Sequence, residues 1–182
     1  GIVRHVLSLD RAELFAVLDN EIDSSLVAVV NELVIRRLAG EPLAYLTGRC
    51  EFYGLDFIVN ENVLVPREET ELLVEGVLQY ARLQPKTNLT VADVGTGSGA
   101  IAVTIACSLP SVTVLASDIS TDALAVADVN RHRHNAADRV HLLEGELLQP
   151  LNQRVDVIVS NPPYIPTARI EGLGPEVGHE PR

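Results

Sequence analysis

The sequence has no methionine, no tryptophan, two cysteines and few aromatic or basic residues. Cys50 and Cys107 have no cysteine or histidine partner at metal-binding spacing, which excludes a disulfide framework and a zinc knuckle. Lysine and arginine number 14 against 25 aspartates and glutamates, and the resulting net charge of -11 argues against a protein that wraps nucleic acid by neutralising phosphates. Polar residues interrupt every apolar stretch before the roughly 18 to 20 residues that a membrane span needs. We therefore expect a cytoplasmic protein without a metal site or a membrane anchor.

The chain does contain enough apolar sequence to build a core. It has 182 residues, of which 47% are hydrophobic, and a chain of this length removes roughly 70% of its unfolded surface from water on folding. This composition predicts one ordinary domain, or one domain with a small accessory domain. The missing start methionine suggests a fragment, and residues from Gly1 onward do not resemble a signal peptide.

The first 42 residues predict a small helical unit. Asp10 followed by Glu13 indicates a capping box that opens a helix over residues 11–19. A second helix is expected from Asp23 or Ser24 to residue 38, because apolar residues recur there at helical spacing and a glycine and a proline follow. The resulting single apolar face needs a partner to pack on.

The next segment predicts a hairpin and then a helix. Residues 51–59 and 63–65 favour strands around an Asn-Glu-Asn turn at 60–62. Pro66 introduces a helix over residues 68–83, whose acidic first turn suits the positive end of the helix dipole.

From residue 89 the chain alternates strands and helices. Strands are expected at 89–94, 112–117, 140–143 and 155–160, and helices at 98–109 and 121–133. This alternation is typical of an α/β fold with a parallel sheet and crossover helices. Four strands make only half of a doubly wound sheet, so we expect further sequence after the C-terminus.

A glycine-rich turn between the first of these strands and its helix predicts a binding loop. Its residues place backbone amides where a negatively charged ligand group can bind: Gly95, Thr96, Gly97, Ser98 and Gly99. The next strand ends at Asp118, whose carboxylate can accept both ribose hydroxyls of a nucleoside cofactor. The spacing of Gly95, Gly97 and Ala100 also suits a nicotinamide dinucleotide, so the loop alone leaves the cofactor open.

The sequence Asn161-Pro162-Pro163-Tyr164 follows the fourth strand and predicts a clamp for a planar NH2 group. The side-chain oxygen of Asn161 and the carbonyl of Pro162 can each accept one N–H bond, the two prolines stiffen the backbone, and Tyr164 can cover the planar group. Holding both hydrogens of an amide nitrogen toward acceptors aims its out-of-plane face at an electrophile. The four residues are therefore candidate catalytic residues for transfer to an amino group.

With these motifs the chain resembles the HemK/PrmC family of S-adenosylmethionine-dependent methyltransferases, which methylate a glutamine of peptide chain release factors. The matching segments are GEPLAYLTG at 40–48, EFYG at 51–54, PREETE at 66–71, DVGTGSG at 93–99, Asp118 and NPPY at 161–164. The resemblance implies a Rossmann-like methyltransferase sheet with a small N-terminal helical domain and a β-hairpin linker. It further implies a substrate-docking domain at 1–43, the linker at 44–66, the methyltransferase domain at 67–182, and both ends cut short.

The resemblance also implies roles for the site residues. The loop from Gly95 to Gly99 binds S-adenosyl-L-methionine, Asp118 the ribose hydroxyls, and Glu146 with Leu147 frames the adenine, although the family more often has an aspartate at 146. Asn161 and Pro162 orient the glutamine of a Gly-Gly-Gln loop, and Asn161 is also expected to contact the cofactor. The expected partner is a release factor, with no direct nucleic acid binding, and the protein is expected to be a monomer.

Four other interpretations compete with this one. A glutamine methyltransferase of a ribosomal protein has the same clamp and a different docking domain. An adenine amino methyltransferase of DNA also uses such a clamp, but the net charge of -11 and the lack of a basic stripe argue against it. A nicotinamide oxidoreductase leaves residues 161–164 without a role, and a non-catalytic binding module leaves the clamp unused.

Overall fold

The computed structural model describes residues 1–17, 19–86, 88–162 and 179–181. Among these, residues 1–48 and 179 form one compact unit, and residues 49–162, 180 and 181 form the other. Within the described part of the chain, no helix is long and apolar enough to cross a membrane.

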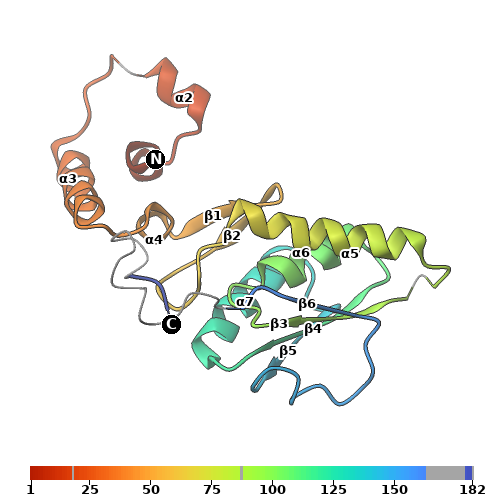
Figure 1. The fold of residues 1–182 in the computed structure, drawn as a ribbon. Helices are drawn as coiled ribbons and strands as arrows, with labels where there is room; N and C mark the ends of the chain where they lie inside the picture. Colours follow the sequence, from red (N-terminus) through yellow and green to blue (C-terminus); the bar gives the residue numbers. More distant parts are fainter. Residues whose placement is uncertain (18, 87, 163–178, 182) are drawn as a thin grey trace. The chain divides into compact units, whose positions relative to one another are not determined.

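The first unit consists of four helices (Figure 1): α1 (Ile2–Leu7), α2 (Arg11–Ala16), α3 (Ser24–Leu38) and α4 (Leu43–Thr47). The predicted capping box is confirmed, because Asp10 and Glu13 exchange backbone-to-carboxylate hydrogen bonds of 2.7 and 2.8 Å. Asp23 caps α3, which contacts α1 and α4. The short helices α1 and α4 carry no capping side chain and were not predicted.

The second unit begins with a hairpin whose turn differs from the predicted one. Strands β1 (Arg49–Phe52) and β2 (Leu55–Ile58) are antiparallel, and the turn lies at Tyr53 and Gly54. Both turn residues have positive φ, 53° and 73°, which matches the twist of a two-residue hairpin. A turn does form at 60–62, where Val63 N–H donates to the carbonyl of Asn60 at 3.2 Å and the side chain of Asn60 accepts a bond from Asn62 N–H. Its assignment as the hairpin turn was wrong, because residues 63–65 form no strand. Tyrosine is an unusual residue for positive φ, which hid the true turn.

Gly54 gives a stability prediction for this turn. At φ +73° a side chain is strained although no atom lies within 4 Å of the position that a Cβ would take, so we expect Gly54→Ala to lower the free energy of unfolding by about 1 kcal/mol. Gly76, in the exposed middle of helix α5 (Glu71–Leu83), has equally open space without a positive φ. Gly76→Ala is the matched control and should raise stability by up to about 1 kcal/mol. Urea denaturation measures both, and equal effects of the two changes would contradict the strain at Gly54.

The rest of the second unit is the predicted parallel sheet with its helices. The strands β3 (Thr90–Val94), β4 (Thr113–Asp118), β5 (Val140–Glu144) and β6 (Val157–Ser160) pair in the order β5-β4-β3-β6. A single 3-10 turn, η1 (Glu68–Thr70), precedes α5, and the crossover helices are α6 (Ala100–Ser108) and α7 (Thr121–Arg133). The expected α/β class, with a helical N-terminal part, is confirmed.

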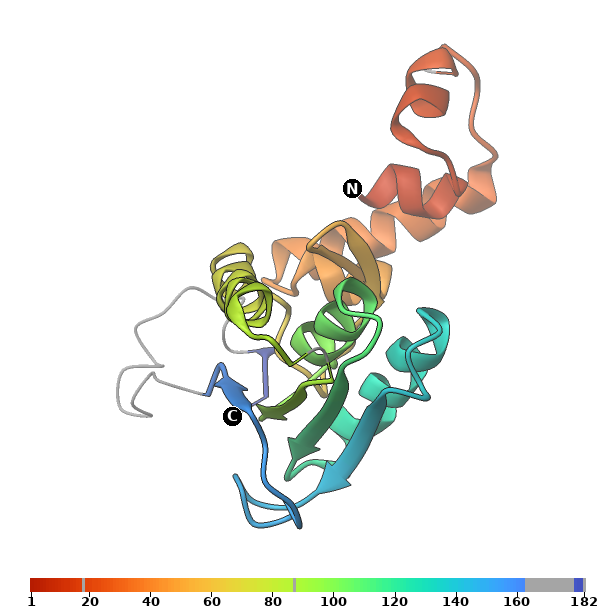
Figure 2. The same ribbon diagram turned by 90° about the vertical axis from the view of Figure 1, so that its right-hand side faces the viewer.

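The core lies between the sheet and three helices on one of its faces. Figure 2 shows α5, α6 and α7 side by side on that face, and α6 contacts both of its neighbours. Helix α6 is buried from Ala100 to Ala106, and its small residues allow close approach to the sheet. Phe52 and Phe57 of the hairpin join this core with at most 1% of their surface exposed. The sheet is thereby fixed, and the carboxyl ends of all four parallel strands meet at one edge.

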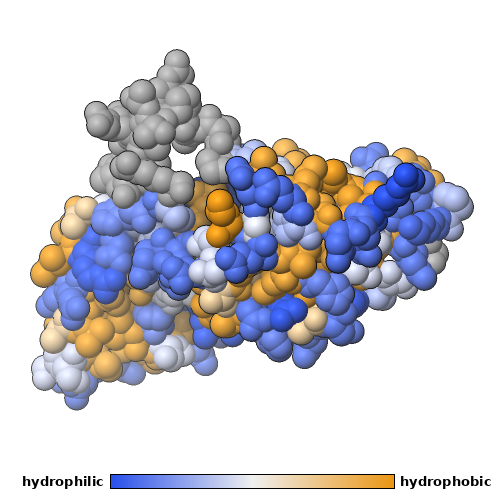
Figure 3. Space-filling model, turned by 90° about the horizontal axis from the view of Figure 1, so that it is seen from below, coloured by the Kyte–Doolittle hydropathy of each residue, from blue (hydrophilic) through white to orange (hydrophobic). Residues whose placement is uncertain are grey.

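Some apolar side chains remain on the surface. Figure 3 shows hydrophobic patches among hydrophilic residues on the face that it displays. Ile158 of β6 and Leu72 of α5 are 54% and 68% exposed. Because β6 is an edge strand of the described sheet, its outer hydrogen-bonding side is not covered by another described strand.

Candidate active site

The predicted site residues that the structure describes follow the carboxyl ends of the four strands. The glycine loop 95–99 connects β3 to α6, Asp118 ends β4, Glu146 and Leu147 follow β5, and Asn161 follows β6. This edge is where open α/β sheets bind their ligands. Pro162 is described and exposed, whereas Pro163 and Tyr164 lie outside the described residues.

Hydrogen bonds fix the glycine loop to the end of β4, and two of its glycines leave backbone that is open to a ligand. The N–H groups of Gly95 and Thr96 donate to the carbonyl of Ser117, at 2.8 and 2.9 Å. Gly95 and Gly97 have φ of 72° and 54°, and no atom lies within 4 Å of the position that a Cβ would take at either. At Gly99 such an atom would lie 3.2 Å from Cβ of Ala127 in α7. The first two glycines therefore leave bare backbone that a ligand can approach, and the third permits close packing of the loop on α7.

Asp118 connects this loop to the neighbouring strand. Its Oδ2 accepts a hydrogen bond of 2.8 Å from Gly97 N–H, and its Oδ1 accepts one of 3.0 Å from Ser120 N–H. An ionised carboxylate has about four acceptor positions, so capacity remains on both oxygens for the hydroxyls of a ligand. The carboxylate is thus oriented by two backbone amides before any ligand binds.

Glu146 and Leu147 lie at the same edge, next to β4. The hydroxyl of Ser117 donates to the carbonyl of Leu147 at 3.2 Å, and Gly145 N–H donates to the carbonyl of Asp118 at 3.0 Å. The Leu147 side chain is 64% exposed, and the residue has φ of 49°. The backbone after β5 is therefore tied to the Ser117-Asp118 end of β4, with an exposed apolar side chain beside it.

Asn161 forms a hydrogen bond with the residue that directly precedes α5. Its Nδ2 donates a 3.2 Å hydrogen bond to Oγ1 of Thr70, and both residues are half-buried. This contact leaves Oδ1 of Asn161 as the acceptor that is available to another group. Thr70 lies in the PREETE segment, whose residues were not among the predicted site residues.

Asp93 is a buried acid at this edge that was not predicted as a site residue. It is fully buried at the end of β3, opposite Ala116 of β4 and Val159 of β6. Its Oδ2 accepts bonds from Thr96 Oγ1 and Ala102 N–H, while its Oδ1 has no partner among the described residues. Burial raises the pKa of Asp93 to about 6, the charge of Asp118 adds to this, and the two hydrogen bonds oppose it.

Asp93 predicts a pH dependence of stability. Because its pKa is raised from 3.8 to about 6 on folding, the native state favours the protonated form of Asp93. The stability that this preference contributes is lost as pH rises from about 4 through 6. We expect Asp93→Asn to remove that slope, so that the variant gains on the order of 1 to 3 kcal/mol relative to the wild type between pH 4.5 and pH 7.5. Urea denaturation at both pH values measures the difference. Parallel pH profiles of the two proteins would contradict a raised pKa.

Asn130 of α7 is a second residue that the sequence did not predict. It is fully buried, and its side-chain amide pairs with both backbone groups of Ile58, at 2.8 and 2.9 Å. The same amide donates to the carbonyl of Ser98 in the glycine loop, at 2.8 Å. Asn130 lies four and three residues after the buried Val126 and Ala127, and this helical spacing indicates that it faces inward. Asn130 thus joins the hairpin to the glycine loop.

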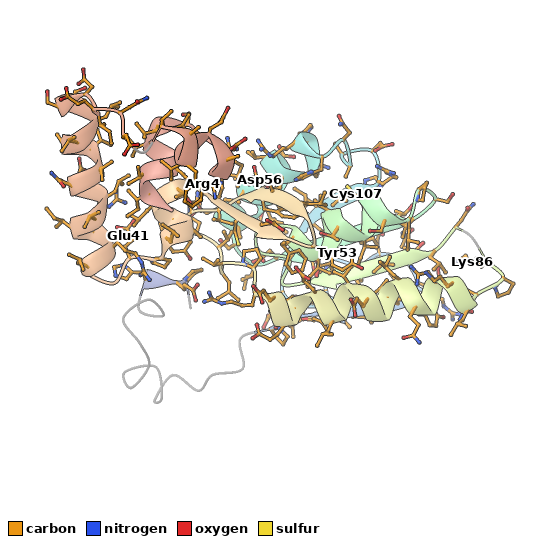
Figure 4. The ribbon with its side chains drawn as sticks, turned by 90° about the horizontal axis from the view of Figure 1, so that it is seen from above. Arg4, Glu41, Tyr53, Asp56, Lys86 and Cys107 are labelled. Atoms are coloured by element: carbon orange, nitrogen blue, oxygen red, sulfur yellow. The ribbon has the colours of Figure 1, made fainter. Side chains whose placement is uncertain are left out.

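The hairpin is fixed to the rest of this unit from two more sides. Glu71 of α5 accepts a 2.7 Å hydrogen bond from Tyr53 N–H, and Figure 4 shows Tyr53 close to that helix. Arg133 of α7 forms a 2.6 Å ion pair with Asp56. The hairpin therefore helps to hold the elements of the candidate site in place.

Comparison with known proteins identifies two regions of the chain. Residues 69–171 match the model of the methyltransferase small domain, and residues 2–48 match that of the PrmC N-terminal domain. The release factor glutamine methyltransferase of Moorella thermoacetica is 48% identical over 96% of this chain. That of Geobacter sulfurreducens is 48% identical over 97% of the chain. The chain spans 62% and 61% of the lengths of these two relatives.

A solved structure shares the fold. The METTL16 methyltransferase domain without its N-terminal segment matches 62% of this chain and 54% of its own, with a TM-score of 0.51 and 21% identity. The parallel sheet and its helices therefore have the methyltransferase fold.

Proposed function

We propose that this chain, which belongs to the methyltransferase small domain family, transfers a methyl group from S-adenosyl-L-methionine to a glutamine side chain. The acceptor is the side-chain nitrogen of the Gly-Gly-Gln glutamine in peptide chain release factors, and the methylation modulates translation termination. The observation that carries the proposal is Asn161 with its acceptor oxygen available, at the same sheet edge as an open glycine loop and an oriented carboxylate.

The residues of the glycine loop suit this cofactor. Bare backbone at Gly95 and Gly97 admits a ligand to van der Waals distance, and the remaining acceptor positions of Asp118 suit the two ribose hydroxyls. Thr96 and Ser98 complete the loop, and Glu146 and Leu147 frame the adenine. When bound, the cofactor supplies an electrophilic methyl group on a sulfonium sulfur.

The protein's own contribution to the reaction is alignment. Oδ1 of Asn161 and the carbonyl of Pro162 accept the two N–H bonds of the glutamine amide and aim the nitrogen lone pair at the methyl group. Pro163 and Tyr164 complete the clamp in this proposal. Effective-molarity measurements attribute up to about 7 to 11 kcal/mol of a barrier to such positioning. Transfer would form the N–C bond as the S–C bond to the methyl group breaks, with S-adenosyl-L-homocysteine as the leaving group. The nitrogen would then lose one proton to water or a nearby acceptor, so that the product is a neutral secondary amide.

The proposal extends to the organisation of the protein. Residues 1–43 dock the release factor, 44–66 link the two parts, and 67–182 belong to the methyltransferase domain. The acidic net charge favours a protein substrate over direct binding of nucleic acid. Such an enzyme acts in the cytoplasm, as a monomer.

One experiment tests the acceptor. The protein, in the full length that its gene encodes, is incubated with S-adenosylmethionine and a release factor, and peptide mass spectrometry locates the added methyl. We expect it on the Gly-Gly-Gln glutamine and not on a factor with that glutamine replaced. A methyl only on a ribosomal protein or on the adenine of a DNA duplex, tested in parallel, would overturn the substrate assignment.

A further inference from the structure

We propose that Thr70 is a positioning residue for methyl transfer, which acts by holding the side-chain amide of Asn161 with its oxygen toward the acceptor nitrogen. The inference rests on the proposed function, because it assigns Asn161 to the clamp. Its direct basis is the 3.2 Å hydrogen bond from Nδ2 of Asn161 to Oγ1 of Thr70.

The position of Thr70 in its helix makes this contact informative. Thr70 is the last residue of the 3-10 turn η1 and has helical backbone angles, φ -70° and ψ -20°, so its side chain is not placed to cap α5 and makes no cap bond. Its hydroxyl instead accepts the bond from Asn161, across 91 residues of sequence.

The segment that carries Thr70 is anchored on both sides. Arg67 forms two hydrogen bonds of 2.6 and 2.7 Å with the carboxylate of Glu180, whose side chain is only 4% exposed. Glu71 holds the hairpin turn through Tyr53 N–H. The backbone of Thr70 itself donates to the carbonyl of Arg67 at 3.0 Å. These contacts fix the backbone of Thr70 and therefore the position of its hydroxyl.

The physical reason for such a device lies in the asymmetry of an amide. Only the oxygen end of the Asn161 side chain can accept an N–H of an incoming glutamine, because its nitrogen end carries two hydrogens. The bond to Thr70 engages the nitrogen end and restrains the rotation of the side chain. Without it, Asn161 samples orientations that present N–H to N–H, and fewer encounters are productive.

The test compares two substitutions of the same residue. Thr70→Val keeps the shape and removes the hydroxyl, whereas Thr70→Ser keeps the hydroxyl and is the matched control. With the full-length protein and a release factor, we expect Thr70→Val to lower kcat by about tenfold, the scale of one hydrogen bond in an active site. KM for the factor and the Kd of S-adenosylmethionine should stay within about twofold, and Thr70→Ser should match the wild type within about twofold.

A double-mutant cycle with Asn161→Ala distinguishes positioning from a structural role. If Thr70 acts through Asn161, Thr70→Val changes single-turnover transfer by less than about twofold in the Asn161→Ala background. A full tenfold loss in that background, or a Thr70→Val protein as fast as the wild type, overturns the proposal.

A second readout does not depend on the acceptor. The side-chain amide resonances of Asn161, identified by their disappearance in Asn161→Ala, should shift in Thr70→Val and stay in place in Thr70→Ser. Unchanged resonances in Thr70→Val overturn the contact. If the wild type methylates another acceptor, the proposed function fails, while the same variants and spectra still decide the role of Thr70.

Discussion

Asn161→Ala is expected to slow methyl transfer about a hundredfold or more, the scale of losing one preorganised polar group in an active site. The affinity for S-adenosylmethionine should change by no more than a few fold. The reason is geometric: Asn161 follows β6 and bonds to Thr70 of the second unit, whereas the glycine loop is held by Ser117, Asp118 and Asn130. The change removes the clamp and leaves the cofactor loop supported.

Single-turnover kinetics with a release factor, together with calorimetric titration of the cofactor, separates the two effects. Asn161→Asp is an informative second variant, because its carboxylate has acceptor oxygens but no N–H group that can donate to Oγ1 of Thr70. We expect it to remain slow. Loss of cofactor affinity in step with turnover would show that Asn161 serves the cofactor site and not the clamp.

Most of the sheet was predictable because each of its elements carries its own signal. Helix α7 was expected at 121–133 and found there, since Ser120 caps it and basic residues fill its last turn. The two central strands, β3 and β4, are short apolar runs, as strands buried on both faces are, and the glycine loop lies between one of them and a helix. These are local patterns, which a single sequence contains in full.

The supporting contacts of the site were not predictable in the same way. The bonds from Asn130 to Ile58 and from Asn161 to Thr70 join residues 72 and 91 positions apart, and no local pattern specifies such a pair. The prediction misplaced the hairpin turn for a related reason. The turn at Tyr53 is held by a hydrogen bond from its N–H to Glu71, which belongs to another element. The sequence therefore indicates the residues at the strand ends better than the distant residues that hold them.

Asp118→Ala is expected to weaken binding of S-adenosylmethionine by roughly two to four orders of magnitude, because each of two hydrogen bonds to a charged group contributes about 1.5 to 3 kcal/mol. In the proposed complex two ribose hydroxyls lose their acceptor. The free protein is affected as well, since Gly97 N–H and Ser120 N–H both donate to this carboxylate. Its removal loosens the glycine loop and the start of α7, and both changes act against the cofactor.

Asp122→Ala is the matched control, because it removes the same charge from an exposed position in the first turn of α7. Calorimetric titration with S-adenosylmethionine should give a Kd within about twofold of the wild type for that control. At saturating cofactor, Asp118→Ala should recover most of its transfer rate, since the acceptor clamp at Asn161 is held separately by Thr70. This behaviour is the reverse of that expected for Asn161→Ala. A rate that stays low at saturation would mean that the carboxylate also positions the reacting groups, and the division of the site into a cofactor half and an acceptor half would then be wrong.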